Sequence, residues 1–326
     1  MKRSAGVTVV AVVSLLGSVL ALCFGVLTGV MAFVMPRPAS APGLPPTAML
    51  VTAGVIYFLP GVWGLLSGIG LIRLKNWARI STIVFGSLLI MVGGFTGVMV
   101  VFLSTMGLTP PDQVNSATAA SVMAVMRGMM TGLAVAQLGI GIWWVVFLTR
   151  PKVAAQFTGG ATVMEGTASG RPISITIIAW FMLLGVLGSI FPLVVHSPVP
   201  FFLTTFSGLP ATLYLIAMIV VVAYCGVGLL RLQPMARLLA IGYFAFGLVN
   251  TAVFALIPGG HARMAALFEW QQTHMTGFVP AADQAPAPFD VVNLIYYSMA
   301  ASTLLMLVPL YFLVTNKRAF ESAAKG

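Results

Sequence analysis

The sequence is short of charged side chains, and above all of acids: only 7% of its 326 residues are charged, and just six are Asp or Glu. Ordinary globular domains carry charge at roughly a quarter of their positions. This shortage excludes a water-soluble globular domain. Cysteine is scarce too, since only Cys23 and Cys225 occur, both inside apolar runs. A disulfide framework is therefore excluded, and both thiols are expected to behave as small buried hydrophobes.

What the sequence has in abundance is long apolar runs. Hydrophobic residues make up 60% of the chain. Eight runs are as long as the roughly 20 residues that an α-helix needs to cross about 30 Å of hydrocarbon. We therefore predict an all-α fold, a polytopic transmembrane bundle of eight helices. The predicted spans are residues 7–34, 48–72, 78–103, 119–148, 173–195, 211–230, 236–257 and 291–314.

The net charge of +10 is carried by residues at the ends of these runs. Positive residues that flank transmembrane segments stay on the cytoplasmic side. With both termini in the cytoplasm, 13 of the 16 basic residues fall on that side, and Arg37, Arg127 and Arg263 fall on the other. The distribution predicts a multi-pass protein of the cell (inner) membrane with both termini cytoplasmic. Because the cations mark topology, no nucleic-acid partner is expected.

One stretch of the chain occurs twice. GIGLIRLKNWARI begins at Gly68, and GVGLLRLQPMARL begins at Gly226, 158 positions later. The two agree at seven of 13 positions. Identities at arginine are informative in a chain where arginine is rare. The repeated arginines are Arg73 with Arg231 and Arg79 with Arg237.

The repeat divides the chain into two tandem four-helix units. They cover residues 1–157 and 171–326, and the polar cytoplasmic linker 158–170 joins them. An even number of helices in each unit makes both units enter the membrane in the same direction. We therefore predict a parallel repeat, related by an axis along the membrane normal.

The repeated arginines bracket a tight turn between two spans in each unit. At that depth an arginine can bury its stem along a helix end and hold its guanidinium among lipid phosphates. Arg127 falls at the outer headgroup level, about 20 residues from the inner boundary of its helix, and an anion contact is the alternative there. The predicted lipid-headgroup anchors are Arg73, Arg79, Arg231, Arg237 and Arg127.

Small residues recur every four positions in two of the predicted helices. Such stripes let neighbouring helix backbones approach closely, within one subunit or between subunits. The residues predicted to mediate helix packing are Gly17, Ala21, Gly25 and Gly29 in the first helix, and Gly128 and Gly132 in the fourth.

Little in the sequence indicates catalysis or ion coupling. All six acids lie outside the predicted spans, whereas coupled carriers usually place a carboxylate near mid-depth. Three histidines and several methionines share the outer side, but their spacing matches no recognised Cu(I) motif. No catalytic residue, metal or cofactor is predicted. Gln137, Asn250 and Asn293 are expected to make hydrogen bonds between helices, and residues 262–274 predict a short helix at the outer interface.

The element GLIRLKNWAR resembles one in loosely grouped, uncharacterised bacterial multi-pass membrane proteins that are built from four-helix units. Trp77 keeps that pattern, and Met235 departs from it in the second copy. The resemblance implies architecture and no activity. We expect a non-enzymatic scaffold or accessory subunit that binds membrane lipids or another membrane protein. The alternative is a channel or carrier with its path between the units, and an enzyme acting on lipid is disfavoured.

Overall fold

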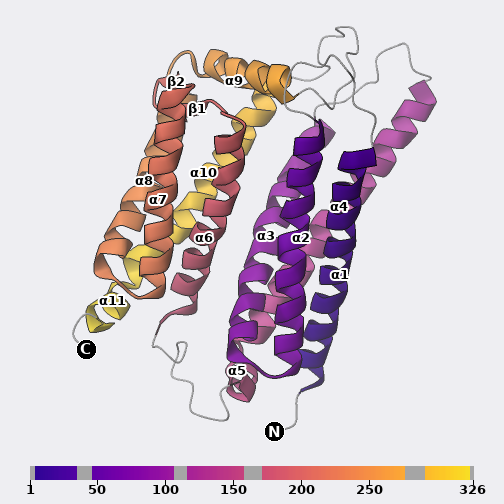
Figure 1. The fold of residues 1–326 in the computed structure, drawn as a ribbon, viewed down its shortest axis with the longest axis vertical. Coiled ribbons are helices and arrows are strands. Elements are labelled where there is room, and N and C mark those ends of the chain that lie inside the picture. The colour runs from indigo at the N-terminus through magenta and orange to yellow at the C-terminus, as the bar shows by residue number, and fades with distance from the viewer. Residues whose placement is uncertain (1–3, 35–45, 106–115, 158–170, 276–290, 324–326) are drawn as a thin grey trace.

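The computed structural model describes residues 4–34, 46–105, 116–157, 171–275 and 291–323. Within them the chain forms eleven α-helices and one two-stranded hairpin (Figure 1). The first half contains α1 (Ala5–Val34), α2 (Pro46–Ile72), α3 (Asn76–Thr105), α4 (Ser116–Thr149) and α5 (Pro151–Phe157). The second half contains α6 (Ile173–Val194), β1 (Val199–Phe201), β2 (Thr204–Phe206), α7 (Leu209–Leu230), α8 (Pro234–Leu256), α9 (Gly260–Met275), α10 (Val291–Thr315) and α11 (Lys317–Ala323).

Seven of the described helices, α1 to α4 and α6 to α8, are long and apolar enough to cross a membrane. The prediction of a helical, multi-pass architecture is confirmed to that extent. α10 has 25 residues, and within the part of it whose side chains the structure describes, the apolar stretch Leu305–Thr315 is shorter than a span. The count of eight crossings therefore stays a prediction. The predicted linker 158–170 lies outside the described residues.

The ends of the predicted apolar runs lie within three residues of the ends of eight helices. Where the starts differ, the helix starts earlier than its apolar run. α2 and α8 begin at Pro46 and Pro234, since proline has no N–H to leave unpaired in the first helical turn. The first turn of these helices is therefore helical in backbone conformation, although it lies before the apolar run.

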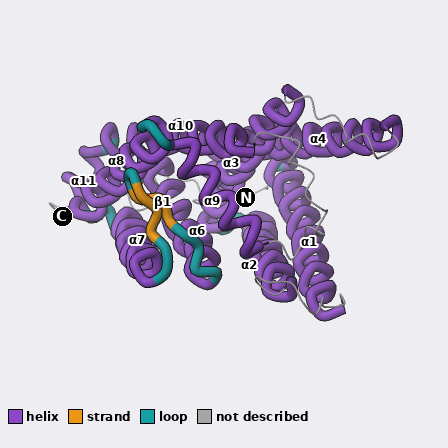
Figure 2. Tube along the Cα trace, turned by 90° about the horizontal axis from the view of Figure 1, so that it is seen from above, coloured by secondary structure: helices purple, strands orange, loops and turns teal. Residues whose placement is uncertain are grey.

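Helices pair within each half and the two halves then meet. α1 packs against α2 and α3 against α4, while α6 packs against α7 and α8 against α10. α3 and α10 both contact α6, and the rings of Trp63 (α2) and Trp180 (α6) lie with their centroids 5.7 Å apart. Figures 1 and 2 both show one end of α4 leaning away from the other helices.

A hairpin and a crossing helix cover one end of the second half (Figure 1). β1 pairs antiparallel with β2, and Phe201 lies opposite Thr204. α9 lies across the upright helices at that same end, which confirms the helix predicted over 262–274. The hairpin was not predicted, because each strand has only three residues. Its signal was the run of β-branched and aromatic residues between Pro198 and Gly208.

The buried side chain of Asn250 holds the hairpin turn. Its Oδ1 accepts a hydrogen bond from the Phe202 N–H at 2.6 Å, and its Nδ2 donates to the Pro200 carbonyl at 3.1 Å. The sequence predicted a bond between helices, and the partner is instead hairpin backbone. Phe202 has a φ of 47°, a conformation that side chains other than glycine adopt only when the surroundings fix it. Asn250 supplies that fixation.

Replacing Asn250 by alanine should loosen the hairpin while the helices stay folded. The half-buried Phe202 N–H and Pro200 carbonyl would each lose their partner, at a cost of about 1 kcal/mol per hydrogen bond. We expect amide hydrogen exchange over residues 199–206 to accelerate about tenfold or more in detergent micelles. Val249→Ala, a change at the exposed neighbouring position, is the control. Unchanged exchange in Asn250→Ala would contradict this role.

Candidate functional site

Four arginines in the described part of the chain donate hydrogen bonds to backbone carbonyls at the C-terminal end of a helix. The last four carbonyls of a helix have no partner within it, and that end carries partial negative charge. Where lipid or protein excludes water from a helix end, a carbonyl without a hydrogen-bond donor destabilises the fold. We call these residues the helix-end arginines: Arg79, Arg171, Arg237 and Arg263.

Arg79, near the start of α3, is bound to the end of α4. Its Nη1 donates to the Leu148 carbonyl at 3.4 Å, and its Nε donates to Asn76 Oδ1 at 3.1 Å. The side chain is only 2% exposed. The sequence predicted a contact with lipid phosphate, and the structure gives Arg79 a different one, because the guanidinium is enclosed between two helices of its own half.

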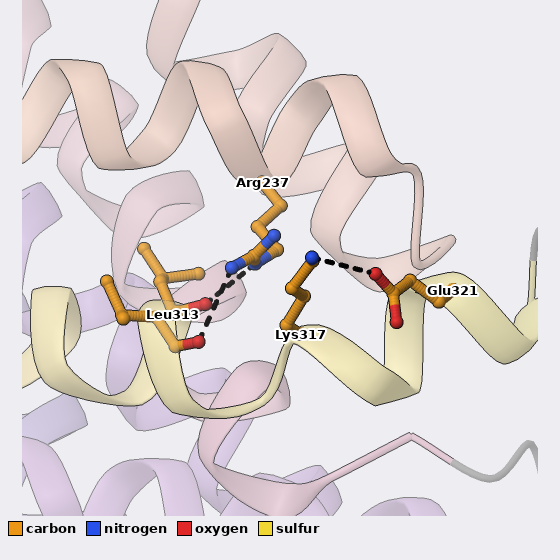
Figure 3. Close-up of polar contacts among 5 residues, drawn as sticks. Arg237, Leu313, Lys317 and Glu321 are labelled. Atoms are coloured by element: carbon orange, nitrogen blue, oxygen red, sulfur yellow. Dashed lines mark hydrogen bonds and ion pairs between the residues drawn. The ribbon is translucent and has the colours of Figure 1, made fainter.

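Arg237 occupies the repeated position in the second half and makes the same kind of contact. Its Nε donates to the Leu313 carbonyl at 2.7 Å and its Nη2 to the Val314 carbonyl at 3.4 Å (Figure 3). Its guanidinium also lies over the ring of Phe320, 5.8 Å from the centroid. Each half therefore fastens its third long helix to the end of its last long helix through one arginine.

The other two helix-end arginines bind helices in the second half. Arg171 Nη1 donates to the carbonyl of Leu230 at the end of α7, and its Nε donates to Thr176 Oγ1 at 2.9 Å. Burial removes water from the Arg171 guanidinium and so lowers its pKa, because the charged form loses hydration. Arg263 of α9 donates to the Phe254 carbonyl at 2.8 Å and so ties α9 to the end of α8.

The turns between α2 and α3 and between α7 and α8 have the same geometry. The Lys75 N–H bonds the Gly70 carbonyl and the Gln233 N–H bonds the Gly228 carbonyl, both at 2.9 Å. Together with the bonds of the preceding leucines, these form a Schellman motif at each helix end. The residue in the left-handed conformation is Leu74 (φ 52°) or Leu232 (φ 53°), where glycine is usual.

A leucine in the left-handed region costs of the order of 1–2 kcal/mol in backbone energy. Burial of its side chain offsets that cost. Leu232 is 8% exposed and belongs to the core of the second half, and Leu74 packs against the core of the first. The glycine at the other side of the turn is also required: a Cβ on Gly70 would lie 2.5 Å from the Ala78 Cβ, and one on Gly228 would overlap Ala236.

The remaining predicted anchors have mixed surroundings. Arg73 and Arg231 are exposed beside their turns, so their guanidinium groups are accessible to lipid phosphate, and the anchoring role stays a prediction for both.

Arg127 is half-buried, and its Nε finds no hydrogen-bond partner among the described residues. It lies 22 residues before Thr149, or about 33 Å at 1.5 Å per residue. α4 begins 11 residues before Arg127, at Ser116, and the predicted place of Arg127 at the outer headgroup level stays a prediction.

The small-residue stripe of α1 meets α2 in part. A Cβ on Gly25 would lie 2.9 Å from the Gly54 carbonyl oxygen, and one on Gly54 would lie 3.2 Å from the Gly29 nitrogen. Ala21 is half-buried and Gly17 is exposed. A Cβ on Gly17, Gly29, Gly128 or Gly132 would meet nothing within 4 Å in the described structure. That Gly128 and Gly132 of α4 pack against a helix therefore stays a prediction, and the helix would belong to another subunit.

The structure also has a cavity of about 130 Å³ between α6, α7 and α8. The sequence gave no signal for it, because a cavity depends on how far apart helices stand. Ser189, on its wall, donates to the Gly185 carbonyl of its own helix at 2.8 Å. The lining is mainly apolar, and Ser189 and Tyr243 are its polar residues. The lining residues are Phe181, Met182, Gly185, Ser189, Val222, Tyr243 and Phe244.

Metal-binding side chains do not cluster over the part of the chain that the structure describes. No group of three or more His, Cys, Asp or Glu side chains gathers there. The ion pair in Figure 3 joins Lys317 Nζ to Glu321 Oε1 at 3.1 Å within α11. The residues that the structure does bring together are the helix-end arginines with helix ends and the apolar side chains around the cavity.

Comparison with known proteins gives no match: no family model, no curated protein and no solved structure is similar to this chain. The resemblance of the GLIRLKNWAR element to uncharacterised four-helix membrane proteins therefore stays a prediction. The apolar helices support the multi-pass architecture that the resemblance implies.

Replacing Arg79 by methionine should destabilise the protein much more than replacing Arg73 by methionine. The first change removes a buried donor and leaves the Leu148 carbonyl without it, a loss of about 1.5–3 kcal/mol for a charged hydrogen bond. Arg73 is exposed, and an exposed change is usually within about 0.5 kcal/mol. Unfolding followed by tryptophan fluorescence in mixed micelles measures the difference. Equal effects of the two changes would contradict the helix-end role.

The turn itself is tested by Gly228→Ala, with Gly242→Ala as the matched control on α8. The new methyl at position 228 would overlap Ala236, and overpacking of this kind costs about 1–3 kcal/mol. A Cβ at position 242 would meet nothing within 4 Å, so that variant should be neutral or slightly more stable. Thermal unfolding in detergent compares them. A stable Gly228→Ala protein would show that the turn geometry is wrong.

Proposed function

We propose that this chain is a non-enzymatic integral membrane protein, a scaffold or accessory subunit that binds membrane lipid or another membrane protein. The observation that carries the proposal is the use of the helix-end arginines. These guanidinium groups are bonded to helix ends of the same chain, so their role is to hold helices together. Selectivity in a channel or carrier needs polar groups that are free to bind the solute.

The hydroxyl groups inside the spans support the same proposal. Ser18 and Thr82 donate to carbonyls four residues earlier in their own helices, at 2.6 and 2.8 Å. Between α2 and α3, Trp63 Nε1 donates to Ser81 Oγ at 2.6 Å, and the Ser67 and Ser81 hydroxyls lie 2.7 Å apart. Bonds of this kind link helices in lipid. They leave these hydroxyls engaged within the protein.

The region between the halves is where the alternative, a channel or carrier, would have its path. There Trp63 and Trp180 lie in ring contact, and α10 contacts both α3 and α6. The tryptophan pair and the contact of α10 with α3 favour a packed interface over a solute path. This supports the scaffold over the carrier.

We further propose eight crossings, with α10 as the eighth, arranged as two parallel four-helix repeats with both termini in the cytoplasm of a cell with an inner membrane. The matched Schellman turns support the repeat. So do the matched contacts of two glycines: a Cβ on Gly68 would meet Leu15, and one on Gly226 would meet Leu183. α1 begins and α11 ends at the same end of the helices (Figure 1), which agrees with an even number of crossings.

Topology is tested by fusing a phosphatase that is active only outside the cytoplasm. Fusions at Asp112 and Asp283 should be active, and a fusion at Gly160 should be silent, because loops rich in lysine and arginine stay cytoplasmic. A reporter that is active only inside the cell, fused at the same three places, is the control for expression. The reverse pattern would overturn the orientation. Activity at only one of the two outer positions would overturn the eight crossings.

Function is tested by gentle purification followed by native mass spectrometry. A protein partner in fixed stoichiometry, or bound lipid that survives transfer from the micelle, supports the scaffold. A retained small polar solute, together with uptake of that solute by proteoliposomes, would overturn the proposal in favour of a carrier. The Arg79→Met variant serves as the control for nonspecific adducts, because weakened helix packing should reduce specific binding and leave nonspecific adducts unchanged.

A further inference from the structure

We propose that the cavity between α6, α7 and α8 holds the acyl chain of a membrane phospholipid. The inference rests on the lipid-binding function proposed above, and it names the ligand and its place. Four observations carry it: the depth of the cavity, the chemistry of its lining, the reason that the helices stand apart there, and the exposure of one wall.

The cavity lies at the depth of lipid chains. Val222 precedes the end of α7 by eight residues, and Ser189 lies 16 residues after the start of α6. At 1.5 Å per residue these positions are about 12 and 24 Å from the same ends of their helices. Hydrocarbon fills a bilayer over about 30 Å. Both positions therefore fall within the hydrocarbon layer and away from the headgroups.

The lining suits a hydrocarbon chain. Phe181, Met182, Val222 and Phe244 present apolar surface, and the Ser189 hydroxyl is already bonded within α6. An apolar cavity of about 150 Å³ in a protein interior stays dry and binds benzene. The pocket between α6, α7 and α8, of about 130 Å³ and open on one side, is of similar size, so it has room for a segment of one acyl chain.

The cavity exists because the two halves differ at one helix pair. In the first half α2 presents Gly54, Gly61 and Gly64 to α1, and a Cβ on any of them would overlap α1 or come within 3.0 Å of it. The residues 158 positions later in α7 are Thr212, Ile219 and Val222. Gly68, the next glycine of α2 that faces α1, is retained in α7 as Gly226, and there the Ala179 carbonyl oxygen would be 3.2 Å from a Cβ.

α6 and α7 therefore meet closely at Gly226 and contact each other over less of their length than α1 and α2 do. Val222, one turn further along, stands at the cavity wall where the first half has Gly64. The larger side chain at this position keeps α6 away from α7. The same sequence difference that removes a close helix contact creates the space.

The open side of the cavity faces outward. Gly185 is exposed, and Ser189, Tyr243 and Phe244 are half-buried. In a bilayer the medium at this depth is lipid chain, so a chain can enter from the side. A Cβ on Gly185 would meet nothing within 4 Å, and this glycine leaves the entrance unobstructed.

The test uses the full chain in vesicles of phosphatidylethanolamine and phosphatidylglycerol that contain a trace of phospholipid with a diazirine midway along one acyl chain. After illumination, mass spectrometry locates the labelled residues. We expect labelling of Phe181 and Tyr243 to exceed severalfold that of Leu20, a residue of α1 that is 70% exposed. Gly185→Leu, which fills the entrance, should lower the cavity labelling severalfold.

Gly17→Leu is the matched control, because Gly17 precedes Gly185 by the 168 positions that also separate Leu15 from Leu183, and a Cβ there likewise meets nothing within 4 Å. It should leave cavity labelling unchanged. Ser189→Leu is a second filling variant, used if Gly185→Leu folds poorly. Labelling no stronger than at Leu20, or unaffected by filling, would overturn the inference. Bound lipid or a partner in native mass spectra would then still uphold the proposed function.

Discussion

The contact on which the rest of the structure depends is a guanidinium group bonded to the C-terminal carbonyls of a helix. The chain has 16 basic residues and six acids, so most of its cations have no carboxylate to pair with. Helix ends supply the negative partner instead, as partial charge on carbonyls that lack an internal hydrogen bond. Arg79 and Arg237 each bind the last long helix of their half. These contacts decide which helix ends lie together.

Around these fixed points the two halves are built alike at one end and differently further along. The turns share their hydrogen bonds, their left-handed leucine and the glycine that faces an alanine. Beyond the turns, glycines bring α1 onto α2 along their lengths, whereas α7 carries larger side chains at the corresponding positions. The two halves thus share the geometry of their turns and differ in the distance between helices. The cavity is a product of that variation.

Helix ends, the repeated turns and the crossing helix α9 could be predicted from the sequence, because hydropathy, proline and glycine act over a few residues. The partners of the arginines could not. Arg79 and Leu148 are 69 residues apart, and Arg237 and Leu313 are 76 apart. The residues next to each arginine do not indicate whether its guanidinium binds a helix end or a lipid phosphate. The hairpin was missed because its strands are short, and the cavity because it depends on spacing between helices.

The helix-end arginines also bear on how the chain assembles as it is made. Every partner lies within the same half, and for Arg79 the partner is in the last long helix of that half. At roughly 5–20 residues per second of synthesis, about 3 to 14 s pass before Leu148 follows Arg79. During that interval the guanidinium must rest among water and phosphate at the bilayer surface. The arrival of α4 then exchanges that temporary partner for a permanent one, so the first half can close before the second is complete.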